Sequence, residues 1–304
     1  MANNVQVVVV GSVALDSIAT VKTRKNDLLG GSCSYACAAA SFFSRTGMVG
    51  IVGSDFPRKA IALYRRFGID LAGLKEVPGK TFRWAGVYEK DMINRRTLST
   101  HLNVFATFSP ELPEKYRSAP FFLLGNIAPD LQMHVLSQAR KPKFVVADTM
   151  DLWINIARKP LVKLISKVNM LTLNDAEARL LTGEHNLIKA AGMILRMGPE
   201  YVVIKKGEHG AVLFSKNGVF IVPAYPIDDV CDPTGAGATF AGSFVGALAR
   251  HGKVSEQTVR DSLICGSAVA SFCCEAFSLD RFIKLDNRHI ASRLAELKKM
   301  TACA

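Results

Sequence analysis

The segment 232–240, which reads DPTGAGATF, holds the residues whose types and spacing best suit chemistry. Gly235 and Gly237, with Ala236 between them, begin an expected helix over 235–250. Glycines at a helix start leave backbone N–H groups bare, and the helix dipole adds positive charge at the same point. This combination predicts an anion hole, which a phosphoryl group needs during its transfer. A helix start that serves only close packing is the alternative.

A carboxylate and a pair of glycines follow the first apolar run of the chain, residues 5–10. Asp16 comes just after this expected strand, at the carboxyl edge where open sheets bind ligands. Its carboxylate can accept two charge-assisted hydrogen bonds from sugar hydroxyls, or it can cap a loop. Gly30 and Gly31 either let the backbone approach a ligand closely or form a plain turn.

Polar side chains also follow three later strands that we expect in the chain. Asn126 and Asp148 stand at the carboxyl ends of two of them, which makes both candidates for lining a site. Asn174 and Glu177 lie about one helical turn apart and share a face. They can hold a water-ligated Mg²⁺ near phosphates, and Asn-x-x-Glu is also the pattern of a helix capping box. Both roles can hold at once.

A lysine and two aromatic residues complete the set of candidates. Lys205 precedes Gly207 and Gly210, where it can steer a nucleotide or simply be a solvated lysine. The two glycines mark a loop that we expect beside the nucleotide. Phe82 and Trp84 can stack on a base or on a sugar face, or they can pin their segment to the core.

Strands and helices that alternate along the chain must position these groups. Apolar runs predict strands at 5–10, 49–52, 121–124, 144–147, 170–173, 202–204 and 211–214. Helical spacing predicts helices at 35–43, 57–67, 131–139, 161–167, 235–250, 259–272 and 288–299. This alternation predicts an α/β fold with a doubly wound, mostly parallel sheet and helices on both faces.

Residues 81–89 and 97–108 break this alternation, because polar and apolar residues alternate there as in half-exposed strands. Together with 13–23 they predict a small β-sheet that projects from the core and closes over the site as a lid. We expect the lid strands within 13–30 and 80–108.

The 304 residues have an ordinary globular composition, with 49% hydrophobic and 21% charged residues, and read as one domain over 1–304. No apolar stretch reaches the roughly 20 residues of a membrane span, and the N-terminus lacks the pattern of a signal peptide. Seven cysteines without paired CxxC motifs suit the reducing cytoplasm. The net charge of +12 comes from scattered lysines and arginines, which favours anionic small molecules over nucleic acid.

Six of these patterns, in this order, resemble the signatures of the ribokinase/PfkB family of carbohydrate and nucleoside kinases. They are Gly11 with Asp16, the Gly30-Gly31 pair, segment 49–55, Asn174 with Glu177, segment 204–210 and segment 232–240. The resemblance covers nearly the whole chain. It implies a ribokinase-like fold, and phosphoryl transfer from ATP, with Mg²⁺, to a hydroxymethyl group of a sugar or nucleoside.

The resemblance and the residue patterns together define the expected site. The expected acceptor-binding residues are Asp16, Gly30, Gly31, Tyr35, Phe82, Trp84 and Asn126. The expected ATP-binding residues are Asn174, Lys205, Gly207, Gly210, Thr234, Gly237 and Ala268. The resemblance implies that Asn174 and Glu177 organise Mg²⁺ through water, that Asp232 is the position for a monovalent cation such as K⁺, and that the lid mediates a homodimer.

Ala238 departs from the family, which carries at this position an Asp that resembles a general base for the acceptor hydroxyl. A methyl group cannot accept a proton, and loss of a positioned base typically costs about a hundred- to ten-thousand-fold in rate. We favour an engineered Asp-to-Ala change in a kinase whose other motifs are kept. A natural pseudokinase or a ligand-binding regulatory protein on the same fold is the alternative.

Tyr35 is a second departure, because many relatives carry a sugar-contacting Asn there. The acceptor therefore stays open between free furanose sugars and ribonucleosides. The sequence predicts an ATP-dependent sugar or nucleoside kinase whose present form transfers phosphate slowly or not at all.

Overall fold

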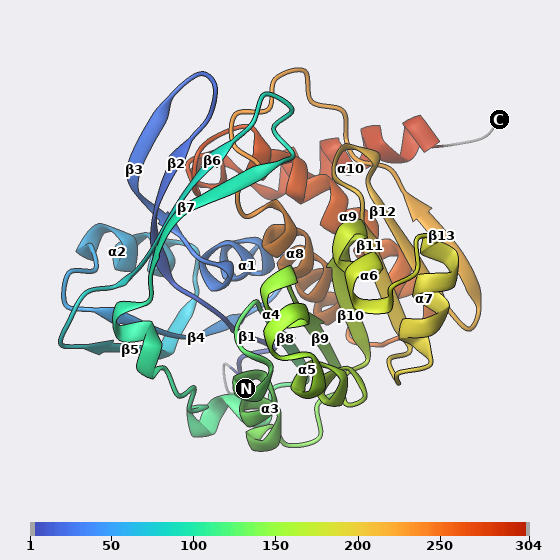
Figure 1. The fold of residues 1–304 in the computed structure, drawn as a ribbon, viewed down its shortest axis with the longest axis horizontal. Helices are drawn as coiled ribbons and strands as arrows, with labels where there is room; N and C mark the ends of the chain where they lie inside the picture. The colour runs from blue at the N-terminus through green and yellow to red at the C-terminus, as the bar shows by residue number, and fades with distance from the viewer. Residues whose placement is uncertain (1–3, 302–304) are drawn as a thin grey trace.

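A nine-stranded sheet runs through the centre of the molecule in the order β13-β12-β11-β10-β9-β8-β1-β4-β5 (Figure 1). This computed structural model describes residues 4–301, so the first and last three residues of the predicted 1–304 domain lie outside the described residues. The strands are β1 (Val7–Val10), β4 (Thr46–Gly53), β5 (Asp70–Val77), β8 (Phe121–Leu124), β9 (Phe144–Asp148), β10 (Met170–Asn174), β11 (Tyr201–Lys205), β12 (Ala211–Ser215) and β13 (Gly218–Val222). From β11 to β5 all neighbouring strands are parallel, whereas β12 and β13 are antiparallel.

The central strands are buried on both faces because their side chains are almost all apolar. Strand β1 reads VVVV, and Val7 and Val9 belong to one hydrophobic cluster while Val8 and Val10 belong to another. Alternate residues of a strand point to opposite faces, so each cluster fills one side of the sheet. The predicted doubly wound α/β fold is therefore confirmed.

Helices cover both faces of this sheet. One face carries α1 (Ser32–Ser41), α2 (Arg58–Arg66), α8 (Ala236–His251), α9 (Glu256–Cys274) and α10 (Asn287–Thr301). The other face carries α3 (Pro129–Gln138), α4 (Asp151–Ile156), α5 (Arg158–Ile165), α6 (Asp175–Thr182) and α7 (Leu187–Leu195). Within residues 4–301 no helix is long and apolar enough to cross a membrane.

A small sheet of four strands, in the order β3-β2-β6-β7, projects from one end of the molecule, at the upper left of Figure 1. Its strands are β2 (Ala14–Ala19), β3 (Arg24–Gly30), β6 (Phe82–Tyr88) and β7 (Arg95–His101). Strands β2 and β6 are parallel, and each edge strand is antiparallel to its neighbour. All four strands lie within residues 13–30 and 80–108, the two ranges expected for the lid strands.

Two expected strands of this sheet are shorter than their alternating patterns. The strand predicted over 97–108 ends at His101, and Asn103–Thr107 forms a 3₁₀ turn. Asn103 has a φ of 50° and its side-chain amide donates to Thr81 O at 2.9 Å, which stops the extended run. The strand predicted over 13–23 ends at Ala19, because the chain reverses there into β3.

Candidate active site

The start of helix α8 has the geometry of an anion hole. Gly235 stands at its N-cap with a φ of 85°, and a Cβ atom at this position would lie 2.4 Å from the Tyr35 ring. Glycine is therefore required both for the left-handed backbone and for the close approach. Within the described residues, no oxygen accepts a hydrogen bond from the backbone N–H of Gly237 or Ala238. These two donors and the helix dipole are free to bind an anion.

Asp16 lies in β2 and is only 4% exposed. Its carboxylate packs so closely on Gly30 that a Cβ atom there would lie 1.9 Å from Asp16 Oδ2. Burial raises the pKa of Asp16 to about 7, against a lowering by the Gly31 N–H, and Asp232 raises it further. Its Oδ1 atom is buried and has no hydrogen-bond partner among residues 4–301. Buried oxygens rarely lack a hydrogen-bond partner, so Oδ1 is suited to accept a hydrogen bond from a ligand hydroxyl.

Tyr35 and Asp232 place two more unpartnered polar atoms near this carboxylate. The Tyr35 hydroxyl is buried without a partner in the described part of the chain. Burial raises its pKa well above the usual range, and nearby Cys273, Asp16 and Asp232 raise it further. Asp232 is fully buried, accepts the Thr234 N–H at 2.9 Å through Oδ1, and leaves Oδ2 unpartnered within the same residues. A buried carboxylate oxygen of this kind suits the predicted monovalent cation.

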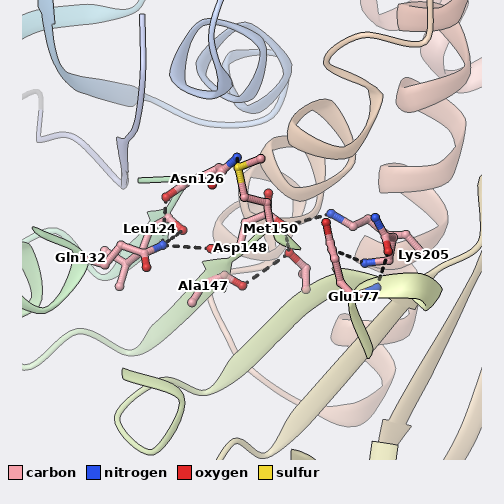
Figure 2. A network of polar contacts seen from close by, with 11 residues as sticks. Leu124, Asn126, Gln132, Ala147, Asp148, Met150, Glu177 and Lys205 are labelled. Atoms are coloured by element: carbon pink, nitrogen blue, oxygen red, sulfur yellow. Dashed lines mark hydrogen bonds and ion pairs between the residues drawn. The ribbon is translucent and has the colours of Figure 1, made fainter. Parts of the chain in front are cut away.

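Lys205 and Asp148 form an ion pair at the carboxyl edge of the sheet (Figure 2). Lys205 Nζ lies 2.9 Å from Asp148 Oδ1, and Thr172 Oγ1 donates to the same oxygen at 2.8 Å. A Cβ atom on Gly237 would lie 3.2 Å from Lys205 Nζ, so the ammonium group stands beside the anion hole. Burial lowers the pKa of Lys205, but the negative charges of Asp148 and Glu177 outweigh it, and the pKa is raised overall.

Asn174 and Glu177 form a capping box at the start of α6. The Asn174 Oδ1 atom accepts the Glu177 N–H at 2.7 Å, and Glu177 Oε2 accepts the Asn174 N–H at 2.7 Å. Burial raises the pKa of Glu177 to about 7, against the charge of Lys205. The capping role is thus confirmed. Oxygen ligands that leave room for water also suit Mg²⁺, so this pair fits the predicted ion.

The aromatic residues of the small sheet are placed around Asp16. In the register of β2 and β6, Asp16 pairs with Trp84 and Ala14 with Phe82, so these side chains share one face. Trp84 lies across Gly86 and donates through Nε1 to Thr97 Oγ1 at 3.2 Å. Phe82 stacks on Phe105 with ring centroids 5.2 Å apart, which pins the sheet to the core.

The remaining expected site residues lie at different depths. Asn126 Oδ1 accepts the indole N–H of Trp153 at 2.8 Å. Met150 Sδ contacts the side-chain amide of Asn126 at 3.0 Å (Figure 2). Gly207 begins the turn after β11 and has open space around it, whereas Gly210 packs against the backbone of Val222. Ala268 is fully buried inside α9, so its methyl group is covered by protein. Its expected role at the adenine remains a prediction.

Trp153, Thr172 and Tyr88 hydrogen-bond to residues of the candidate site, and the sequence analysis did not single them out. Trp153 lies five residues after Asp148 on α4, and Thr172 lies in β10 beside that carboxylate. Tyr88 shares a hydrogen bond with Thr234 Oγ1 at 3.1 Å. The sequence marks them only by position: Trp153 comes soon after β9, Thr172 lies within β10, and Tyr88 ends β6. In residues 4–301, no three His, Cys, Asp or Glu side chains gather closely enough to hold a metal ion without other ligands.

This architecture is the ribokinase-like α/β fold, and solved structures share it over most of the chain. A nucleoside kinase from Burkholderia thailandensis, solved in complex with inosine, superposes with a TM-score of 0.76 at 17% identity, covering 96% of this chain and 98% of that one. A putative ribokinase II from E. coli, solved with ATP and Mg²⁺, superposes with a TM-score of 0.78 at 17% identity, covering 96% and 99%.

Sequence comparison places the chain in a family. The family model described as "pfkB family carbohydrate kinase" matches residues 3–283. A cytidine kinase from Thermococcus kodakarensis is 30% identical to this chain, with 83% of this chain and 91% of the relative covered. The protein therefore belongs to the pfkB family of carbohydrate kinases, which confirms the resemblance seen in the sequence motifs.

Proposed function

We propose that this protein is an ATP-dependent kinase that phosphorylates a hydroxymethyl group of a nucleoside or a free sugar. The observation that carries this proposal is the bare helix start at Gly237, with the Lys205 ammonium group beside it. Two N–H donors and a buried cation stabilise the charge on a phosphoryl group in transfer. Asp16, with an unpartnered buried oxygen, supplies a separate place for acceptor hydroxyls.

Mg²⁺ and K⁺ have places in this proposal. When bound, Mg²⁺ would neutralise the charge of the ATP phosphates, and Asn174 and Glu177 would hold it through water. Asp232 Oδ2 would face a monovalent cation, since it is buried and unpartnered within the described residues. Lys205 binds phosphate oxygens directly, because its amine is fixed beside the anion hole.

We place a nucleoside first among acceptors. Trp84 lies next to Asp16 on one face of the small sheet, which puts an aromatic ring beside the hydroxyl-binding carboxylate. Such a ring stacks on a nucleobase as well as on a sugar. The relatives support this order, because one is a cytidine kinase and one binds inosine. A free furanose is the second acceptor.

A homodimer in the cytoplasm is the assembly and location that we propose. Leu98 in β7 and Val21 in the connection between β2 and β3 are 48% and 57% exposed, and a partner subunit would cover such apolar side chains. The described cysteines are all free, as expected in a reducing compartment.

A ligand-binding protein without turnover is the second candidate function, because Ala238 removes the family's base carboxylate. The test is ADP formation from ATP and Mg²⁺ by the protein with Ala238 and by Ala238→Asp, across ribonucleosides and free pentoses. We expect one acceptor to be phosphorylated, and the Ala238→Asp protein to turn over faster. If neither protein forms ADP with any acceptor while both bind ATP calorimetrically, the kinase proposal fails and the binding protein is favoured.

A further inference from the structure

Tyr88 joins the small sheet to the segment that carries the anion hole. It is the last residue of β6 and is only 4% exposed. The Thr234 hydroxyl donates a hydrogen bond to the Tyr88 hydroxyl at 3.1 Å. Thr234 directly precedes Gly235, which is the N-cap of α8. A side chain of the small sheet is therefore bonded to the residue just before the anion hole.

Two further contacts of Thr234 come from the side of the molecule that carries α8 and α9. Its N–H donates to Asp232 Oδ1 at 2.9 Å, and its carbonyl oxygen accepts a hydrogen bond from the Cys273 thiol at 3.4 Å. Both of these contacts hold the main chain. The hydroxyl bond to Tyr88 is the contact through which the small sheet acts on the same residue.

Tyr88 shares one face of the small sheet with the carboxylate that we propose for acceptor hydroxyls. Asp16 of β2 pairs with Trp84 of β6, and the register between these two strands does not shift. Alternate side chains of a strand share a face, so Tyr88, four residues after Trp84, lies on the same face as Asp16. Tyr88 also packs with Ile18 and Phe277 in one hydrophobic cluster. One packed set of side chains thus links the carboxylate to the Tyr88 hydroxyl.

Other contacts attach the small sheet to the same side of the molecule without reaching the anion hole. Lys22 and Asp229 form an ion pair whose side chains are 63% and 73% exposed, and such exposed pairs contribute little. The Ser278 hydroxyl donates to Leu29 O at 2.5 Å. Among the hydrogen bonds and ion pairs of residues 4–301, only the hydroxyl bond at the end of β6 joins the four strands to segment 232–237.

We propose that Tyr88 is a positioning residue that couples acceptor binding at the small sheet to ATP binding at the anion hole. This inference rests on the proposed kinase function. An acceptor hydroxyl bound at Asp16 fixes this face of the small sheet, including Tyr88. The Tyr88 hydroxyl then holds Thr234, and with it the start of α8, in the position that binds a phosphate. The coupling concerns binding alone, so it does not require a base at position 238.

Calorimetry measures this coupling as a ratio of two dissociation constants. They are the Kd values of the β,γ-methylene analogue of ATP, with Mg²⁺, in the absence and in the presence of a saturating acceptor. The analogue cannot transfer its γ-phosphate, so the protein with Ala238 is used unchanged. Cytidine, inosine and ribose are the acceptor probes. We expect a ratio of about five or more with one of them, and the same ratio when the acceptor is titrated instead, because coupling between two sites is reciprocal.

Tyr88→Phe removes the hydroxyl and keeps the packed ring. It should bind each ligand alone nearly as before and lower the coupling ratio by about two- to tenfold, which is the contribution of one hydrogen bond. Thr234→Val removes the other hydroxyl and should lower the ratio equally. The double variant should lower it no further, because both changes remove the same bond.

Tyr116→Phe is the matched control. The Tyr116 hydroxyl is also buried, and it donates to Asp70 O at 2.7 Å, at the β5 edge of the large sheet. Its loss should lower the melting temperature and leave the coupling ratio unchanged. Circular dichroism and thermal unfolding of every variant show that folded proteins are compared.

Three results would overturn the role of Tyr88. They are a ratio in Tyr88→Phe equal to that of the unchanged protein, an equal fall of the ratio in Tyr116→Phe, and a ratio of one in the unchanged protein with every acceptor probe. In each case the ATP analogue still binds, so the anion hole stands and only the coupling fails. If the analogue binds to none of the proteins, the proposed kinase function fails together with this inference.

Discussion

Asp16 and Glu177 are carboxylic acids whose surroundings oppose ionisation. Burial raises the pKa of each to about 7. A carboxyl group whose pKa is higher in the folded chain stabilises the fold fully below its unfolded pKa, near 4. That contribution is lost as the pH rises through the folded pKa. The free energy of unfolding of the ligand-free protein should therefore fall between about pH 4 and pH 8.

Asp16→Asn should remove a large part of this pH dependence, because an amide does not titrate. Each raised pKa lowers stability by at most about 2 to 3 kcal/mol between pH 5 and pH 8. Urea unfolding at the two pH values measures the difference. Asp130→Asn is the control, since that carboxylate is exposed, and it should keep the slope of the unchanged protein. An unchanged slope in Asp16→Asn would contradict the burial of an ionisable Asp16.

Helix α8 carries the anion hole, and its position depends on close packing against α1. A Cβ atom on Gly242 would lie 2.2 Å from the Ala36 carbonyl oxygen, which is backbone and cannot turn aside. Residues this close leave no room for one methyl group, because protein interiors are packed as densely as crystals. The seam between α1 and α8 therefore sets where Gly235 and Gly237 stand.

Gly242→Ala should lower the free energy of unfolding by about 1 to 3 kcal/mol and slow phosphoryl transfer, because α8 must move. Gly192→Ala on α7 is the matched control. A Cβ atom there meets only the far end of Arg196, at 3.7 Å, so this change should stabilise the protein by about 0.5 to 1 kcal/mol. Chemical denaturation of both variants makes the comparison. Equal stabilities would show that α1 and α8 do not pack this closely in solution.

The whole molecule carries a net charge of +12, spread over its surface as single and paired basic residues. Such a field attracts anionic ligands over distances comparable to the Debye length, about 10 Å at 0.1 M salt. ATP is anionic and a nucleoside is neutral. The positive field of the protein should therefore attract ATP and leave the binding of a neutral nucleoside unaffected.

Raising the salt concentration from about 0.05 M to 0.5 M should raise the KM for ATP several-fold. The KM for a neutral nucleoside should stay constant, which makes the acceptor an internal control. Steady-state kinetics at the two salt concentrations, with the anion held the same, measures both. A parallel rise in the two KM values would point to a general salt effect on the enzyme and contradict steering by net charge.

Secondary structure was predictable where strands are apolar throughout. Strands β1, β8 and β9 were expected within a few residues of their bounds because they are buried on both faces. Strand β5 was not expected, because it lies at the edge of the sheet and reads DLAGLKEV. Strand β3 was not separately expected for a similar reason, since its first four residues are exposed. Edge strands lack the apolar signal that burial imposes.

Local patterns in the sequence determined the fold class, the glycine helix start of α8, the capping box of α6 and the family. These features depend on neighbours a few residues apart, so spacing alone reveals them. Only the tertiary structure decided that Lys205 pairs with Asp148, 57 residues away, and that the Tyr35 ring lies under Gly235. Such pairings follow from the order of strands in the sheet and from helix packing. The order of the strands brings the ends of β9 and β11 to one edge, where the Lys205 ammonium group pairs with Asp148 and stands beside the anion hole.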